Sequence, residues 1–205
     1  MDSGRRPLAV SLAGVHGVGK TTVFRAIEDR GRLDADFFRE RAIADPPVPF
    51  GSRDREIAFR SQVYFFQEML ARDRLVRGGS ERTYAFLDRS PCCVVVYGSV
   101  LCDKTDRGIL ESLYLAHDFL EDVVVYLEGD PDVVAERSAG RGRPKSWNED
   151  DGKYRVKISD AYDGFFDRFE DVGKKVKRLD VSDTTPDETA AEIERLVSKL
   201  VPKQL

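Results

Sequence analysis

Residues 14–22 read Gly-Val-His-Gly-Val-Gly-Lys-Thr-Thr, and this stretch decides the fold. It satisfies the pattern G-x-x-x-x-G-K-[ST]. The apolar run at residues 8–13 predicts a buried strand before it, and residues 20–28 predict a helix after it. A glycine-rich loop in this position turns backbone N–H groups toward an anion, and the positive end of the helix dipole points the same way. We therefore predict a phosphate-binding loop.

The residue types of the loop suit a nucleoside triphosphate with magnesium. Lys20 can neutralise the β- and γ-phosphates, and the Thr21 hydroxyl can coordinate Mg²⁺. The pattern does not require His16, which could hydrogen-bond a sugar hydroxyl, contact an acceptor phosphate or simply pack in the loop. We assign all nine positions to nucleotide binding: Gly14, Val15, His16, Gly17, Val18, Gly19, Lys20, Thr21 and Thr22.

Composition limits the class of protein. The chain has 205 residues, 41% of them hydrophobic and 34% charged, which suits one compact domain over residues 1–205. Its net charge of -4 argues against a long nucleic-acid footprint. No apolar stretch reaches membrane-spanning length, residues 1–10 lack a signal-peptide core, and the three cysteines form no metal-binding pattern. We expect a soluble cytoplasmic protein without a membrane partner.

Strand and helix signals alternate along the chain. The strand predictions fall at residues 8–13, 36–40, 84–87, 123–127 and 176–181. The helix predictions fall at residues 20–28, 55–76, from 130 onward, 154–169 and 186–200. This alternation predicts an α/β fold in which a parallel sheet is covered by helices on both faces.

Two acidic positions follow predicted strands, where parallel sheets place their ligands. Asp88 could hold Mg²⁺ through water, and the adjacent Arg89 could stabilise charge on a transferring phosphoryl group; a helix cap with a solvated arginine is the alternative. Glu40 could accept the proton of an attacking hydroxyl, or pair with Arg39 or Arg41 at the surface.

Residues 137–153 are basic and contain glycine, which suits a lid that closes over phosphate. We assign Arg137 to the nucleotide, and Arg141 and Arg143 to the phosphoryl group in transfer. A solvated basic loop is the alternative interpretation.

Taken in order, GVHGVGKT, the Asp88-Arg89-Ser90 triplet and RSAGRGR resemble the thymidylate kinase and deoxynucleoside kinase group of P-loop kinases over nearly the whole chain. The resemblance implies a three-layer α/β/α fold with a five-stranded parallel sheet and a lid. It also implies ATP with Mg²⁺ as cofactors and a nucleoside or nucleoside monophosphate as acceptor. His16 departs from both families, since thymidylate kinases often have aspartate there and nucleoside kinases an apolar residue.

The acceptor side matches both families in part. Phe66-Gln67 with Arg74 resembles the base-recognising arrangement of deoxynucleoside kinases, and Arg60-Ser61-Gln62 resembles the R-x-Q that holds the acceptor phosphate in thymidylate kinases. One helical stripe contains Arg60, Tyr64, Gln67, Ala71 and Arg74. We assign this stripe to the acceptor; its alternative is that it faces water.

The resemblance also implies a role for Tyr97. Thymidylate kinases have a tyrosine near the base at a similar place, whereas packing in the core is the other interpretation for this chain. The apolar positions of residues 55–76 could form a homodimer face or belong to the core.

We therefore expect an ATP-dependent phosphotransferase that acts by in-line transfer. Lys20, the loop amides and Mg²⁺ on Thr21 and Asp88 would hold the donor. Glu40 or Asp88 would accept the proton of a hydroxyl acceptor, and a monophosphate acceptor would need little base help. One alternative is a kinase of another small hydroxyl compound, such as nicotinamide riboside. A GTPase is the other, because residues 103–106 (Asp-Lys-Thr-Asp) superficially resemble a guanine-recognising motif.

Overall fold

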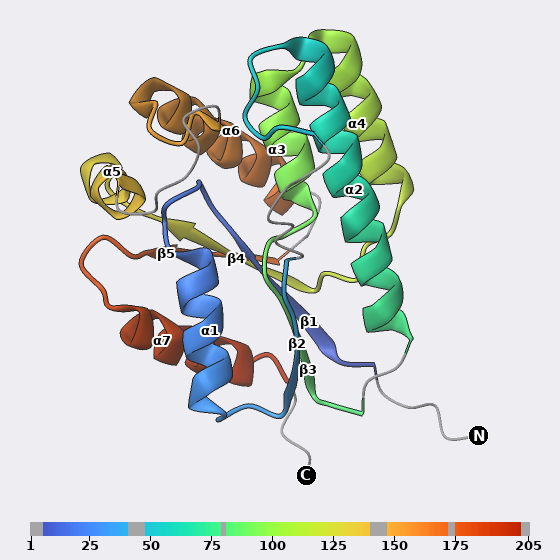
Figure 1. The fold of residues 1–205 in the computed structure, drawn as a ribbon. Coiled ribbons are helices and arrows are strands. Elements are labelled where there is room, and N and C mark those ends of the chain that lie inside the picture. Colours follow the sequence, from blue (N-terminus) through green and yellow to red (C-terminus); the bar gives the residue numbers. More distant parts are fainter. Residues whose placement is uncertain (1–5, 41–47, 79–80, 140–146, 172–174, 202–205) are drawn as a thin grey trace.

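The computed structural model describes residues 6–40, 48–78, 81–139, 147–171 and 175–201, and it is built around one parallel sheet (Figure 1). The strand order is β2-β3-β1-β4-β5, and each neighbouring pair is parallel. The bounds are Leu8–Ala13 for β1, Ala35–Phe38 for β2, Tyr84–Leu87 for β3, Val123–Glu128 for β4 and Lys175–Asp180 for β5. The prediction of a five-stranded parallel sheet is confirmed.

Helices cover both faces of the sheet and complete the three layers (Figure 1). Their bounds are Lys20–Arg30 for α1, Arg55–Arg77 for α2, Cys92–Leu101 for α3, Lys104–Ala116 for α4, Pro131–Ala139 for α5, Gly152–Asp171 for α6 and Pro186–Ser198 for α7. Helix α1 packs on α7, whereas α3 packs on α2, α4 and α6. None of the described helices is long and apolar enough to cross a membrane.

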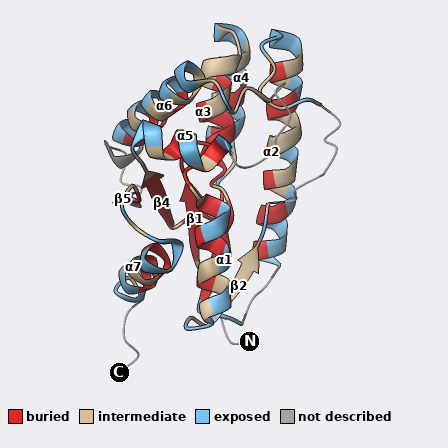
Figure 2. Ribbon diagram, turned by 60° about the vertical axis from the view of Figure 1, so that its left-hand side comes forward, coloured by how far each residue is buried: buried red, intermediate tan, exposed pale blue. Residues whose placement is uncertain are grey.

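The core lies between the central strands and these helices. Strands β1 and β4 are buried along most of their length, as the red ribbon in Figure 2 shows. Their runs are apolar on both faces because helices cover both sides of a parallel sheet. Ser11 is the polar exception in β1; its hydroxyl donates a hydrogen bond to Glu121, which is also buried.

Helices α3 and α4 are the elements that the sequence patterns above did not predict. Helix α3 is apolar and buried on nearly all sides, so it has no clear apolar stripe. Helix α4 begins after Asp103, whose carboxylate accepts hydrogen bonds from Thr105 N and Asp106 N at 2.9 and 3.0 Å. Residues 103–106 therefore form a helix N-cap that follows a helix, and the guanine-recognition hypothesis is wrong for this stretch.

Buried Asp73 anchors helix α2 to the connection between α4 and β4. Its carboxylate accepts hydrogen bonds from Leu120 N at 2.7 Å, Arg77 Nε at 2.7 Å and His117 Nε2 at 3.1 Å. Burial alone would raise the pKa of Asp73, but these donors outweigh burial, and the pKa is lowered. The contact ties the carboxyl-terminal half of α2 to the segment that leads into β4.

We expect Asp73→Asn to lower the free energy of unfolding by about 1–3 kcal/mol at pH 7, because it leaves buried donors without a charged partner. The lowered pKa of Asp73 means that its contribution is complete above the unfolded value of about 3.9 and is lost as the pH falls below it. Urea unfolding at pH 7 and pH 3 should therefore show the difference from the parent protein narrowing in acid. Exposed Asp160→Asn serves as the control, and a constant difference would contradict the assignment.

Candidate functional site

The predicted site residues lie together at the carboxyl ends of the parallel strands. The phosphate loop follows β1, Glu40 follows β2, and Asp88 follows β3, so all three leave the carboxyl ends of adjacent strands. Two backbone hydrogen bonds extend the pairing beyond the strands: Asp88 N donates to Phe38 O at 3.0 Å, and Ser90 N donates to Leu12 O at 2.9 Å. Long-range pairing therefore sets the spacing of the site residues.

The loop has the backbone geometry that its glycines predict. Gly14, Gly17 and Gly19 have φ angles of 142°, 89° and 109°, which favour glycine. A Cβ on Gly14 would also lie 2.6 Å from Leu127 O. Lys20 is buried, and its Nζ donates to the carbonyls of Gly14 and Val15 at 2.8 and 2.9 Å. Burial, followed by the charge of Arg89, lowers the pKa of Lys20 to about 8. An arriving phosphate would favour the charged form.

Thr21 and Asp88 meet across the sheet edge. The Thr21 hydroxyl donates to Asp88 Oδ2 at 3.1 Å. Both groups offer oxygen, which Mg²⁺ prefers, and Mg²⁺ usually completes its shell with water and substrate phosphates. Within the described residues no group of three or more His, Cys, Asp or Glu could hold a metal alone. The oxygens of Thr21 and Asp88 are thus the groups here that would fit Mg²⁺.

Arg89 has an unusual backbone and a defined partner. Its φ of 76° lies in the left-handed region, and its Nε lies 2.9 Å from Glu40 Oε2. Burial lowers the pKa of Arg89, but the carboxylate of Glu40 outweighs burial, so the net shift is upward. Arg39 pairs with Glu28 instead, which removes Arg39 as the surface partner proposed for Glu40; residue 41 lies outside the described residues.

Arg72, which sequence analysis did not identify, holds this turn in place. It is buried, and its two terminal nitrogens each donate at 2.5 Å, one to Asp88 O and the other to Arg89 O. Burial lowers the pKa of Arg72, and the nearby carboxylates of Glu40 and Asp88 counteract this. No sequence pattern indicates this role, because the contact joins α2 to the end of β3, far away in the chain.

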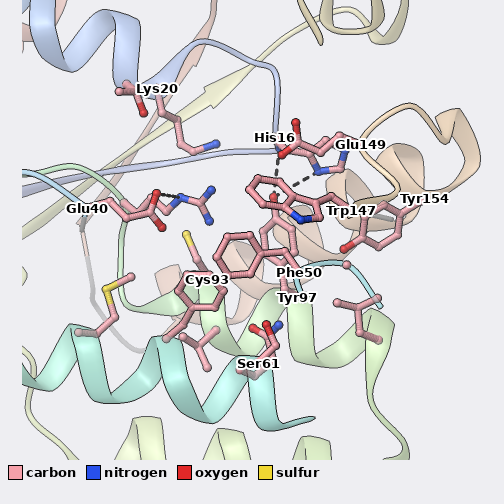
Figure 3. Close-up of a pocket in the computed structure, with 18 of the residues that line it drawn as sticks. His16, Lys20, Glu40, Phe50, Ser61, Cys93, Tyr97, Trp147, Glu149 and Tyr154 are labelled. Carbon is pink, nitrogen blue, oxygen red and sulfur yellow. Dashed lines mark hydrogen bonds and ion pairs between the residues drawn. The ribbon is translucent and has the colours of Figure 1, made fainter. Parts of the chain in front are cut away.

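A cavity of about 360 Å³ opens beside the phosphate loop (Figure 3). At one end lie Lys20 and Glu40, and Trp147 and Tyr154 lie toward the other. Aromatic rings form much of the wall: Phe50 packs against Phe65 and Trp147, each with ring centroids 4.7 Å away. The aromatic wall suits a flat ring system, and the charged end suits phosphoryl chemistry.

Helix α2 presents a different face to this cavity from the one predicted. Ser61, Gln62, Phe65 and Met69 line it, and Gln62 is only 4% exposed. The predicted stripe lies mainly toward solvent: Arg60, Gln67, Ala71 and Arg74 are exposed, and Tyr64 is half-buried. Arg60 pairs with Glu56 at 3.0 Å. The assignment of this stripe to the acceptor is therefore corrected. Packing buries a neighbouring face of α2 at the cavity and leaves the predicted stripe exposed.

The structure thus separates Arg60 from Ser61 and Gln62 within the Arg60-Ser61-Gln62 triplet. Gln62 points into the cavity and Arg60 does not, because positions two apart on a helix lie on different faces. The residue triplet was the signal for Gln62, but it did not show which of its members would be buried.

Tyr97 lies on α3, at the cavity wall next to the phosphate loop. Its hydroxyl accepts a hydrogen bond from His16 N at 3.1 Å. Burial raises the pKa of the Tyr97 hydroxyl, so it stays protonated at neutral pH. Tyr97 packs on Tyr162 in the core and also lines the cavity, and its place near a base stays a prediction.

A second cavity, of about 270 Å³, lies on the other side of the loop. Gly17, Val18 and Gly19 line it together with Arg137 and Val181. Arg137 donates hydrogen bonds to Val181 O at 2.9 Å and Ser182 O at 3.3 Å, which hold its guanidinium flat against this wall. The structure places Arg137 beside the phosphate loop, and its contact with a nucleotide stays a prediction. Arg141 and Arg143 lie outside the described residues.

Several cavity residues were not predicted. Phe50 and Gly51 come from the loop before α2, and Trp147 and Glu149 come from the segment before α6. The two segments touch: the Asn148 side chain donates to Gly51 O, and a Cβ on Gly51 would lie 2.1 Å from Trp147 O. Only tertiary contact brings them together, so periodicity could not identify them.

Comparison with known proteins identifies the fold. No family model and no curated protein matches the chain. Three solved structures of deoxyadenosine kinase from M. mycoides are similar. One, with the products dCMP and a flexible dCDP bound, is 15% identical with a TM-score of 0.73, covering 93% of this chain and 99% of its own. The structures with dATP and dCTP are each 18% identical, with TM-scores of 0.73 and 0.70, covering 94% of this chain and 98% and 100% of theirs. The chain therefore has the P-loop fold of the deoxynucleoside kinases.

Proposed function

We propose that this protein transfers the γ-phosphate of ATP to a hydroxyl group of a nucleoside. The observation that carries the proposal is that Glu40 lines the same cavity as Lys20 and Thr21 of the phosphate loop. A carboxylate beside the phosphate-binding residues can accept the proton of an attacking hydroxyl.

On the donor side, the loop amides and Lys20 bind the phosphates, and Arg137 lies where the nucleotide base would enter the second cavity. Thr21 and Asp88 would hold Mg²⁺, which when bound neutralises charge on the phosphates. Arg89 stabilises the charge of the phosphoryl group from the cavity side, and its pairing with Glu40 fixes both side chains. As lid residues, Arg141 and Arg143 are proposed to stabilise the phosphoryl group in transfer.

On the acceptor side, the aromatic wall and Gln62 suit a nucleoside base. An amide can donate and accept at once, as paired groups on a base edge require, and Gln62 lies among apolar and aromatic side chains. Base stacking on aromatic side chains adds affinity without requiring charge. The similar deoxyadenosine kinase structures contain bound deoxynucleotides, which supports this class of acceptor.

The charges favour a hydroxyl acceptor over a monophosphate. Arg60, the residue expected to hold an acceptor phosphate, pairs with Glu56 outside the cavity. Among the described lining residues the arginines are Arg25 and Arg89, and Arg89 is already paired with Glu40. A carboxylate in the cavity would also repel an acceptor phosphate.

The function is tested with a panel of nucleosides, nucleoside monophosphates and nicotinamide riboside, incubated with ATP and Mg²⁺. We expect nucleosides to gain one phosphate, as measured by product mass, and Lys20→Ala to abolish this gain because the β- and γ-phosphates lose their cation. Conversion of monophosphates alone, or no product above the ATP hydrolysis background, would refute the proposed acceptor class.

We expect Glu40→Gln to lower kcat by about 10²–10⁴-fold, since the amide cannot accept the hydroxyl proton. The Kd of ATP, measured by calorimetry, should change little, because Glu40 faces the acceptor cavity. Glu28→Gln is the matched control, as Glu28 pairs with Arg39 away from the cavity. A kcat within threefold of the parent value would rule out Glu40 as the base.

A matched pair on α2 tests the orientation of this helix. Gln62→Ala should raise the KM of the nucleoside about tenfold, because a buried base edge loses its hydrogen-bond partner. Gln67→Ala, five residues away on the exposed face, should leave the KM unchanged. A raised KM for Gln67→Ala together with an unchanged KM for Gln62→Ala would instead assign the acceptor to the exposed stripe that contains Gln67.

A further inference from the structure

We propose that His16 determines acceptor specificity by hydrogen bonding, through Nε2, to a hydroxyl of the acceptor that does not itself react. This inference rests on the proposed function and assigns a residue that the phosphate-loop pattern leaves free. It also distinguishes the two ligand roles that the sequence left open for His16, a sugar hydroxyl or an acceptor phosphate.

His16 lies on the acceptor side of the phosphate loop. Its side chain lines the cavity that contains Glu40 and Gln62, whereas Gly17–Gly19 line the cavity on the nucleotide side. Its backbone N–H donates to Tyr97 Oη, which ties this part of the loop to α3 (Figure 3). Within residues 14–19 of the loop, His16 is therefore the residue that lines this cavity.

Two tyrosines fix the orientation of the imidazole. The ring stacks on Tyr154 with centroids 5.4 Å apart and planes 23° from parallel. Nδ1 lies 3.5 Å from Tyr97 Oη, at the outer limit of a hydrogen bond. Because Nδ1 faces the protein, Nε2 is the nitrogen left for another partner.

Nε2 is buried and makes no hydrogen bond of good geometry with the residues that the structure describes. The backbone of Glu149 lies close enough to the imidazole to raise its pKa slightly, against the larger effects that lower it. Two other buried atoms of cavity-lining residues share this condition, Ser61 Oγ and Glu149 Oε2. A buried polar atom without a partner costs free energy, and such atoms are rare in native proteins. A polar ligand in the cavity would supply the missing partner.

The electrostatic surroundings select a hydroxyl as that partner. Burial, followed by the charges of Lys20, Arg155 and Arg89, lowers the pKa of His16 to about 3. The imidazole is therefore neutral at pH 7, with one N–H and one lone pair. It has no positive charge to attract a phosphate, but it can donate to or accept from a hydroxyl.

The test compares His16→Gln with His16→Asn. A glutamine amide nitrogen can occupy the place of Nε2, whereas an asparagine nitrogen reaches only the place of Nδ1. The kcat/KM of each variant is measured on a nucleoside and on its 2′-deoxy and 3′-deoxy analogues. We expect His16→Asn to lose tenfold or more on the acceptors that carry the bonded hydroxyl and almost nothing on the analogue that lacks it. His16→Gln should recover most of the loss, and the KM of ATP should stay constant.

An equal loss on all three acceptors, or no loss, would overturn the role of His16 while leaving the proposed function intact. Absence of transfer to any nucleoside by the parent protein would overturn the proposed function and this inference with it. Thermal unfolding verifies that each variant folds; if His16→Asn does not, His16→Leu replaces it and the same selective loss is expected.

Discussion

The site depends on one buried cation. Arg72 extends from α2 and donates to the carbonyl oxygens of two consecutive residues, Asp88 and Arg89. A buried guanidinium is costly unless its donors are satisfied, so these contacts fix the helix and the turn relative to each other. They also hold Arg89 in a left-handed conformation that costs a non-glycine residue about 1–3 kcal/mol. Because the turn is held in this way, Asp88 faces Thr21 and Arg89 faces Glu40.

The charges around the phosphate loop alternate in sign. Lys20 and Arg89 are cationic, and Asp88 and Glu40 are anionic, so each charge has an opposite neighbour before any phosphate arrives. Some of these charged groups already have partners within the protein. Lys20 donates hydrogen bonds to two loop carbonyls, and Glu40 forms an ion pair with Arg89. Burial, and after it the charges of Lys20, Arg155 and Arg89, lower the pKa of His16, so a neutral imidazole lies beside these charged groups. The two cavities beside the loop are thus lined by different groups, with Lys20, Glu40 and His16 in one and Gly17, Val18 and Arg137 in the other.

Helix α2 shows why a helical pattern alone does not locate a binding surface. Its predicted stripe is geometrically correct, because Arg60, Gln67 and Arg74 do share a face. That face is exposed, while Gln62 and Phe65 turn into the cavity. Both faces contain apolar and polar residues, so periodicity could not rank them. Packing on α3, the Asp73 anchor and the Phe50–Phe65 contact set the rotation of the helix.

The sequence by itself determined the phosphate loop, the five strands and the acidic residues at the strand ends. These features depend on local hydrogen bonding, on glycine conformations and on the rule that parallel strands place their carboxyl ends together. Tertiary structure alone decided which face of α2 meets the cavity, that residues 92–116 form two helices, and that Phe50 and Trp147 close one wall. It also decided that His16 is buried, has a lowered pKa and lines the cavity that contains Glu40. The physical reason is that each of these depends on burial and on contacts between segments far apart in the chain.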